Sequence, residues 1–165
     1  MWVCKPITLP RRAVLAGGLV GGLALAACGF TPVYGPDGAG TRLFGQVRVM
    51  DPKTSDDYAF NRRITERLGP DQAARFALEY RLAVATVAQA ITPDEVTTRY
   101  ALNGTADYTL TEGGRAVARG QVSSFASYST TGTTIATLAA EQDARERLMR
   151  MLADQVLTRL LAAAP

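Results

Sequence analysis

Two long stretches in the middle of the chain alternate between apolar and polar side chains. One runs from Phe76 to Gln89 and the other from Thr97 to Thr111. In the first, Glu79 and Arg81 fall on one side, opposite a row of phenylalanine, leucine, tyrosine and valine side chains. A period of two over such long runs predicts antiparallel strands with one buried face. This feature constrains the fold most, because the apolar face of such a sheet must be covered by another layer.

Two further segments are predicted to complete the sheet. Leu43–Met50 contains alternating valines and is expected to form a first strand. Glu112-Gly113-Gly114-Arg115 has the form of a two-residue hairpin turn, since glycine adopts the positive φ that such a turn needs. It leads into a fourth strand over Arg115–Tyr128. Apolar residues change side within that strand, so we predict a β-bulge near Ser123-Ser124.

Two amphipathic helices are predicted to cover the sheet. Apolar residues spaced by four predict a helix that begins near Asp57, is capped by Ser55 or Asp56 and stops at Gly69-Pro70. A longer helix is expected from about Thr137 to Ala163. The apolar arc of this second helix comprises Leu138, Leu148, Met149, Leu152, Ala153, Val156 and Leu160. The predicted fold class is α+β: a four-stranded, mainly antiparallel sheet with two helices packed on one face.

A sorting signal stands near the start of the chain. The segment from Leu25 to Gly29, Leu-Ala-Ala-Cys-Gly, ends an apolar run and has the form of a lipobox, in which the Cys28 thiol accepts a lipid. The alternatives are a buried structural cysteine and an uncleaved transmembrane helix. The run from Ala13 to Ala27 is shorter than the roughly 20 residues that a spanning helix needs. Basic residues precede the run, and no acidic residue occurs before Asp37, as in a signal peptide.

The lipobox divides the chain into three predicted parts. Residues 1–27 are expected to be a cleaved lipoprotein signal peptide, residues 28–42 a lipidated tether, and residues 43–165 a single α+β domain. All 15 acidic residues follow Cys28, and 15 of the 18 basic residues do so. The mature chain is therefore formally neutral, which disfavours a strongly basic nucleic-acid binder. Arg11-Arg12 leaves open whether export uses the general or the twin-arginine route.

Residue types also limit the chemistry of the mature chain. Its one cysteine would carry lipid, so no disulfide is expected. The chain has no histidine, which excludes a histidine-ligated metal or a histidine base. We expect no cofactor and no bound metal. Ser123, Ser124 and Ser127 are the serines that a hydrolase reading would have to use, but no Gly-x-Ser-x-Gly elbow is present.

Cys28-Gly29-Phe30-Thr31-Pro32-Val33-Tyr34-Gly35 resembles the lipidated opening of LptE, the lipopolysaccharide-assembly lipoprotein of Gram-negative bacteria. The segment from Ala139 to Leu160 resembles the last helix of alphaproteobacterial members of that family. The resemblance implies a non-enzymatic protein that plugs and helps to assemble the LptD β-barrel. It also implies that the protein binds lipopolysaccharide and assists its transport to the outer leaflet.

The resemblance identifies no lipopolysaccharide-binding residue in this chain. Arg81 and Arg99, on the polar side of the sheet, are candidates because arginine binds phosphate bidentately; the alternative is that each is solvated or faces the barrel. Gly29 in place of the aspartate common in inner-membrane lipoproteins suggests an outer-membrane destination. The rival hypothesis is another envelope lipoprotein that acts as a lipid carrier or scaffold without an LptD partner.

Overall fold

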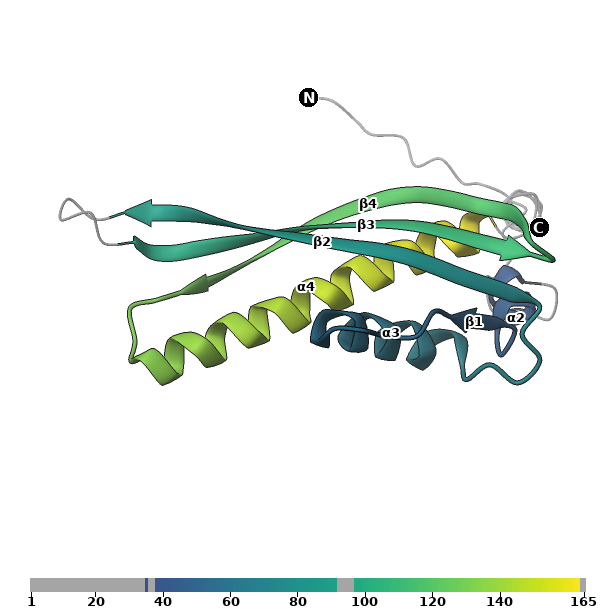
Figure 1. The fold of residues 1–165 in the computed structure, drawn as a ribbon, viewed down its shortest axis with the longest axis horizontal. Coiled ribbons are helices and arrows are strands. Elements are labelled where there is room, and N and C mark those ends of the chain that lie inside the picture. The colour runs from purple at the N-terminus through teal and green to yellow at the C-terminus, as the bar shows by residue number, and fades with distance from the viewer. Residues whose placement is uncertain (1–34, 36–37, 92–96, 164–165) are drawn as a thin grey trace, which may run out of the picture. The chain divides into compact units, whose positions relative to one another are not determined.

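A computed structural model describes Gly35, residues 38–91 and residues 97–163 of the chain. The predicted signal peptide, Cys28 and the connection from Thr92 to Val96 lie outside these residues. Within the described residues, seven elements follow one another (Figure 1). They are α2 (Ala39–Leu43), β1 (Val47–Val49), α3 (Ser55–Leu68), β2 (Phe76–Ile91), β3 (Thr97–Glu112), β4 (Arg115–Ser129) and α4 (Thr134–Ala163).

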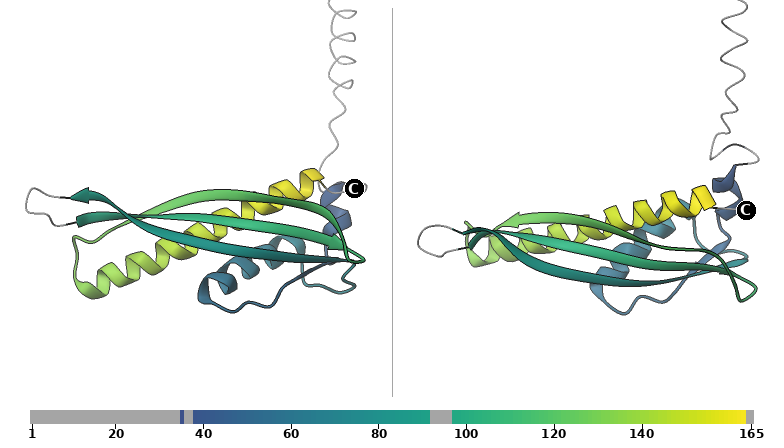
Figure 2. Two further views of the ribbon diagram at one scale, coloured as in Figure 1. Left: turned by 45° about the horizontal axis from the view of Figure 1, so that its top comes forward. Right: turned by 90° about the horizontal axis from the view of Figure 1, so that it is seen from above.

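The strands form one sheet in the order β1-β2-β3-β4. Strand β1 pairs with β2 in parallel, whereas β2–β3 and β3–β4 are antiparallel. The long helices α3 and α4 lie on one face of the sheet (Figures 1 and 2). Gly113 and Gly114 turn the β3–β4 hairpin with φ of 55° and 82°, as a type I′ turn requires. The predicted α+β class is confirmed, with α2 as an additional short helix.

The core lies between the sheet and the two long helices. From α3, the side chains of Phe60, Ile64 and Leu68 are almost fully buried. The α4 residues from Leu148 onward that were predicted to face the core are buried as expected. Leu138 is an exception: its side chain is 56% exposed. The prediction for Leu138 was wrong because the first turns of α4 extend beyond the packed core.

The irregularity in β4 lies elsewhere than predicted. Pairing with β3 is continuous from Ala118 to Ser129, and the register shifts near Val117, between the partners of Leu110 and Thr111. The predicted bulge at Ser123-Ser124 was therefore wrong. Phe125 does not alternate in step with the core residues of β4 because its side chain lies on the outer face of the sheet, where it is 68% exposed.

The first helix of the pair, α3, begins at Ser55, two residues before the predicted start near Asp57, and neither of the predicted residues caps it. Thr54 is the N-cap: its Oγ1 accepts a hydrogen bond from Asp57 N (3.2 Å), and Asp57 Oδ2 accepts one from Thr54 N (2.9 Å). This reciprocal capping box satisfies two N–H groups at the helix start, whereas a cap at Ser55 or Asp56 satisfies fewer. The predicted stop at Gly69-Pro70 is confirmed, with Gly69 at φ 74°.

The predicted first strand is shorter than expected. Leu43 ends α2 with its side chain buried, so only Val47–Val49 of the predicted segment pairs with β2. Helix α2 crosses the predicted border between tether and domain at residues 42 and 43, and that border stays a prediction. Among the described residues, no helix combines the length and the hydropathy needed to cross a bilayer.

Candidate functional site: a polar groove on the outer sheet face

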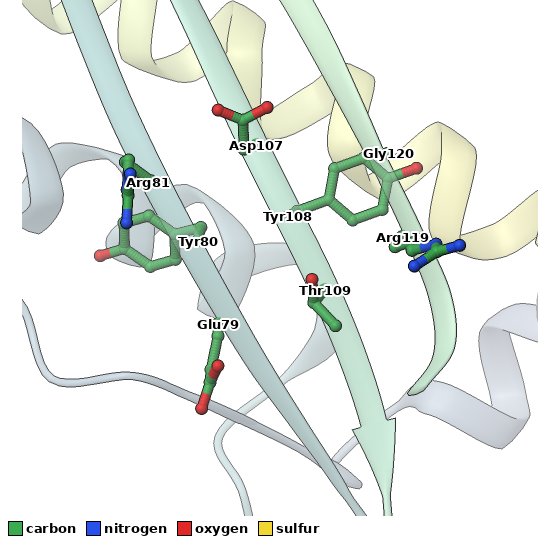
Figure 3. Close-up of a pocket in the computed structure, with 8 residues that line it drawn as sticks. All are labelled: Glu79, Tyr80, Arg81, Asp107, Tyr108, Thr109, Arg119 and Gly120. Carbon is green, nitrogen blue, oxygen red and sulfur yellow. The ribbon is translucent and has the colours of Figure 1, made fainter. Parts of the chain in front are cut away.

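The face of the sheet that points away from the helices carries a groove of about 680 Å³ (Figure 3). Residues of three adjacent strands line it. They are Glu79, Tyr80 and Arg81 of β2, Asp107, Tyr108 and Thr109 of β3, and Arg119 and Gly120 of β4. The tyrosines belong to the core cluster. The groove surface that meets solvent is therefore set mainly by charged side chains and Thr109.

Strand pairing arranges the charged side chains in two rows. Arg81 lies opposite Asp107, and Asp107 lies opposite Gln121. In the next row, Glu79 and Arg119 flank Thr109 on β3. Gln121 Nε2 donates a hydrogen bond of 2.7 Å to Asp107 Oδ1. The two arginines thus lie diagonally across the groove, about 12 Å apart at Cα by strand spacing and rise.

Half of the described arginines form ion pairs with carboxylates, and Arg81 and Arg119 belong to the half that does not. Within the described residues neither forms an ion pair, whereas the arginines of α3 and α4 that face each other do. Both side chains are exposed. An unpaired guanidinium keeps its five donors available, and its planar fork matches phosphate or carboxylate. The groove can therefore bind an anion at two points.

Sequence reasoning identified Arg81 and missed Arg119. The face of the sheet on which Arg119 lies depends on the register of β4. The predicted bulge at Ser123-Ser124 left that register undetermined. The register of β4 could have been inferred from the two-residue turn at Gly113-Gly114 together with the apolar residues Val122 and Tyr128 on the core face. That register places Arg119 on the outer face.

Arg99, the other predicted site residue, lies far from this groove. It is exposed at the start of β3, opposite Ser129 of β4. Eight residues separate it from Asp107 along one strand, which is about 27 Å at the usual rise. The structure therefore does not bring Arg81 and Arg99 into one site. Cys28, the predicted lipid attachment residue, lies outside the described residues.

A second hollow, of about 610 Å³, lies between α3 and α4. Its arginines are already paired: Arg145 contacts Asp56 at 3.3 Å and Glu141 at 3.2 Å, and Arg62 contacts Glu146. An incoming anion would have to compete with these carboxylates, so the outer groove is the better anion site.

The described residues offer little for bond-making chemistry. Burial raises the pKa of the Tyr80 hydroxyl, and the negative charge of Asp57 adds to that rise. Ser123 and Ser127 are exposed on the outer face, whereas Ser124 points inward, with its Oγ 3.7 Å from Met151 Sδ. In the described part of the chain, no three acidic or cysteine side chains are placed to hold a metal ion.

The sequence matches the model of the family LptE, described as lipopolysaccharide-assembly, over residues 42–160. This match covers well over half of the chain. The chain belongs to the LptE family. The match spans the described sheet, α3, and α4 as far as Leu160, so the groove lies inside the part of the chain that the LptE family shares.

Solved structures show the same fold. A proposed lipoprotein of Caulobacter crescentus superposes with a TM-score of 0.62 at 19% identity, covering 75% of this chain and 93% of that one. The rare lipoprotein B of Shewanella oneidensis gives 0.56 at 16% identity, with coverages of 71% and 94%. Lipoprotein B of Nitrosomonas europaea gives 0.56 at 11%, with 72% and 83%. No curated protein sequence matches the chain significantly.

Proposed function

We propose that this LptE-family protein is an outer-membrane lipoprotein that plugs and helps to assemble an LptD-type β-barrel. In this role it assists the transport of lipopolysaccharide to the outer leaflet and binds lipopolysaccharide non-covalently. The family match over residues 42–160 carries the proposal. The role needs binding surfaces and no bond making, so we propose no enzymatic activity and no cofactor.

The membrane anchor in this proposal is the lipid on Cys28. Acyl chains there, after removal of residues 1–27, would hold the domain at the periplasmic side of the outer membrane or within the barrel. One acyl chain alone binds membranes marginally, so stable anchoring needs more than one chain. Residues 28–42 would then connect anchor and domain.

The outer face of the sheet suits a polar lumen. Alongside the charged groove, β3 presents Asn103 and Thr105, and β4 presents Ser123. The interior of an outer-membrane barrel is polar, so the polar part of this face can lie against it. Val87 and Phe125 are the large apolar side chains exposed on the same face. The helix-covered face of the sheet supplies the stable core behind it.

Lipopolysaccharide binding is assigned to the outer groove. Its lipid A phosphates are anions that arginine binds bidentately. Arg81 and Arg119 form no ion pair with any described carboxylate that would compete for an anion, and Asp107 accepts a hydrogen bond from Gln121. Arg99 stays a separate candidate at the far end of the sheet.

Purification from detergent-solubilised outer membrane tests the barrel partner. We expect the mature protein to co-purify with one large β-barrel protein. A mature protein that runs alone would reject the plug role and favour a lipid carrier or scaffold without an LptD partner.

Charge reversal tests the lipopolysaccharide site. The double variant Arg81→Glu/Arg119→Glu should bind lipopolysaccharide at least about 100-fold more weakly than the wild type, since each of the two charge-assisted contacts contributes about 1.5–3 kcal/mol. Arg99→Glu tests separately whether Arg99 contributes to lipopolysaccharide binding. Arg67→Glu is the matched control, because Arg67 is exposed on α3, on the opposite side of the sheet.

The readout is lipopolysaccharide bound per mole of purified protein, at fixed salt. Asp107→Asn should increase retention, because it removes a negative charge from the groove. Equal retention by the double variant and the Arg67→Glu control would remove the groove as the site.

A further inference from the structure

The outer edge of β2 is only partly paired. Strand β1 contacts just Phe76, Ala77 and Leu78 of a strand that continues to Ile91. Among the described strands, none pairs with the outer edge of β2 beyond Leu78 (Figure 1). An edge of this length leaves a row of backbone donors and acceptors open to another chain.

The direction of the open backbone groups follows from the bonds at the start of β2. Phe76 N donates to Gln46 O, Met50 N donates to Leu78 O, and Tyr80 N donates to Met50 Sδ. These even-numbered β2 residues therefore point their backbone groups away from β3. Strand alternation extends this to Leu82, Val84, Thr86 and Ala88. The edge ends where the pairing with β3 shifts register, after Ala88.

Between Leu82 and Ala88, this open edge carries neither a charge, a proline nor a β-bulge that would block strand addition. From Leu82 to Ile91 the sequence has no charged residue, no proline and no glycine. Natural edge strands are protected by charges, prolines, bulges or covering elements. The edge of β4 is protected in this way: Arg119 and Arg115 lie on it, and Arg147 of α4 donates to Ser127 O.

Side chains on both sides of this edge fit an uncharged neighbour. On the outer side, Ala83 and Ala85 are exposed and Val87 is 45% exposed. On the inner side, Leu82 and Val84 are only half-buried. A charged strand placed here would have its side chains desolvated without partners, whereas small or β-branched side chains would pack.

We propose that the Leu82–Ala88 edge of β2 accepts an extended, uncharged segment of the barrel partner, about seven residues long, as an added strand beside β2. This inference rests on the proposed function, because the barrel supplies the segment. Main-chain hydrogen bonds to the even-numbered residues provide the affinity, and the apolar flanks select an uncharged segment. The added strand continues the position that β1 occupies beside the first residues of β2.

Hydrogen exchange on the full-length lipoprotein, alone and co-expressed with the LptD-type barrel of the same bacterium, tests the proposal. In the complex, the amides of Val84, Thr86 and Ala88 should exchange on the order of 100-fold more slowly than in the free protein. Amides that exchange equally fast in both samples would overturn the added strand.

Substitutions at Thr86 supply the second measurement. Thr86→Pro removes an outward N–H without removing a bond to β3, which an edge strand tolerates, and should reduce co-purified barrel about tenfold. Thr86→Ala is the matched control: it keeps the N–H and should bind as the wild type does. Circular dichroism checks the fold, and Thr86→Lys, which adds a charge and keeps the N–H, replaces the proline variant if that variant does not fold.

The outcomes separate this inference from the proposed function. A complex with unprotected edge amides, and with Thr86→Pro binding as the wild type does, rejects the added strand and leaves the barrel partnership intact. Edge amides already protected in an isolated dimer would assign the edge to a second copy and overturn the proposal. Absence of any complex with the barrel rejects both.

Discussion

Gly104 lies in the middle of β3, on the sheet face that α4 covers. A Cβ at this position would come within 2.9 Å of Leu148 Cδ2 and 3.0 Å of Leu152 Cδ1. The absence of a side chain therefore sets how closely the helix approaches the sheet. Gly104→Ala should lower the free energy of unfolding by about 1–3 kcal/mol, the usual cost of overpacking, as measured by urea denaturation.

The same residue offers a coupling test. Leu148→Ala alone should cost about 2–5 kcal/mol, because its side chain is fully buried. In the double variant, the alanine at 104 occupies part of the vacated space, so the combined loss should be smaller than the sum. Strict additivity would show that Gly104 does not control the helix–sheet distance.

At the scale of one element, the start of α3 depends on Thr54. Thr54→Ala removes the side-chain acceptor of the capping box and should destabilise the protein by about 1 kcal/mol, measured as a lower melting temperature. Ser55→Ala is the matched control, because Ser55 is already inside the helix and exposed. A larger loss for Ser55→Ala than for Thr54→Ala would contradict the observed cap.

At the scale of the whole molecule, α4 is longer than the core it covers. Ile135 and Leu138 in its first turns are 83% and 56% exposed, whereas Leu152 and Leu160 are fully buried. Leu138→Ala should change the free energy of unfolding by less than about 0.5 kcal/mol. Leu152→Ala should lower it by about 2–5 kcal/mol. Chemical denaturation of both variants measures the contrast, and equal losses would place Leu138 in the core.

Much of the fold was predictable because its signals are local. Period-two alternation located β2 and β3 to within two residues, and paired glycines located the turn into β4. Within α4, residues four apart form ion pairs: Glu141 with Arg145 at 3.2 Å and Glu146 with Arg150 at 3.9 Å. These features depend on neighbours three or four residues away or on the backbone preferences of single residues.

The candidate site was predictable only in part. Arg81 was identified because alternation in β2 places it opposite the apolar face. Arg119 was missed, and Arg99 was grouped with Arg81, because both assignments require the pairing of strands across the sheet. In β4, small residues occupy both faces, so the hydrophobic pattern does not specify its register.

By itself, the sequence determined the α+β class, the long strands, the helix faces and the lipobox expected at Cys28, since local periodicity and short motifs carry that information. Only the tertiary structure decided that Arg81 and Arg119 share a groove, that Leu138 lies beyond the core, and that the edge of β2 is open after Leu78. These properties depend on which segments, distant in sequence, lie side by side. That is set by packing of the whole domain rather than by the preferences of any one segment.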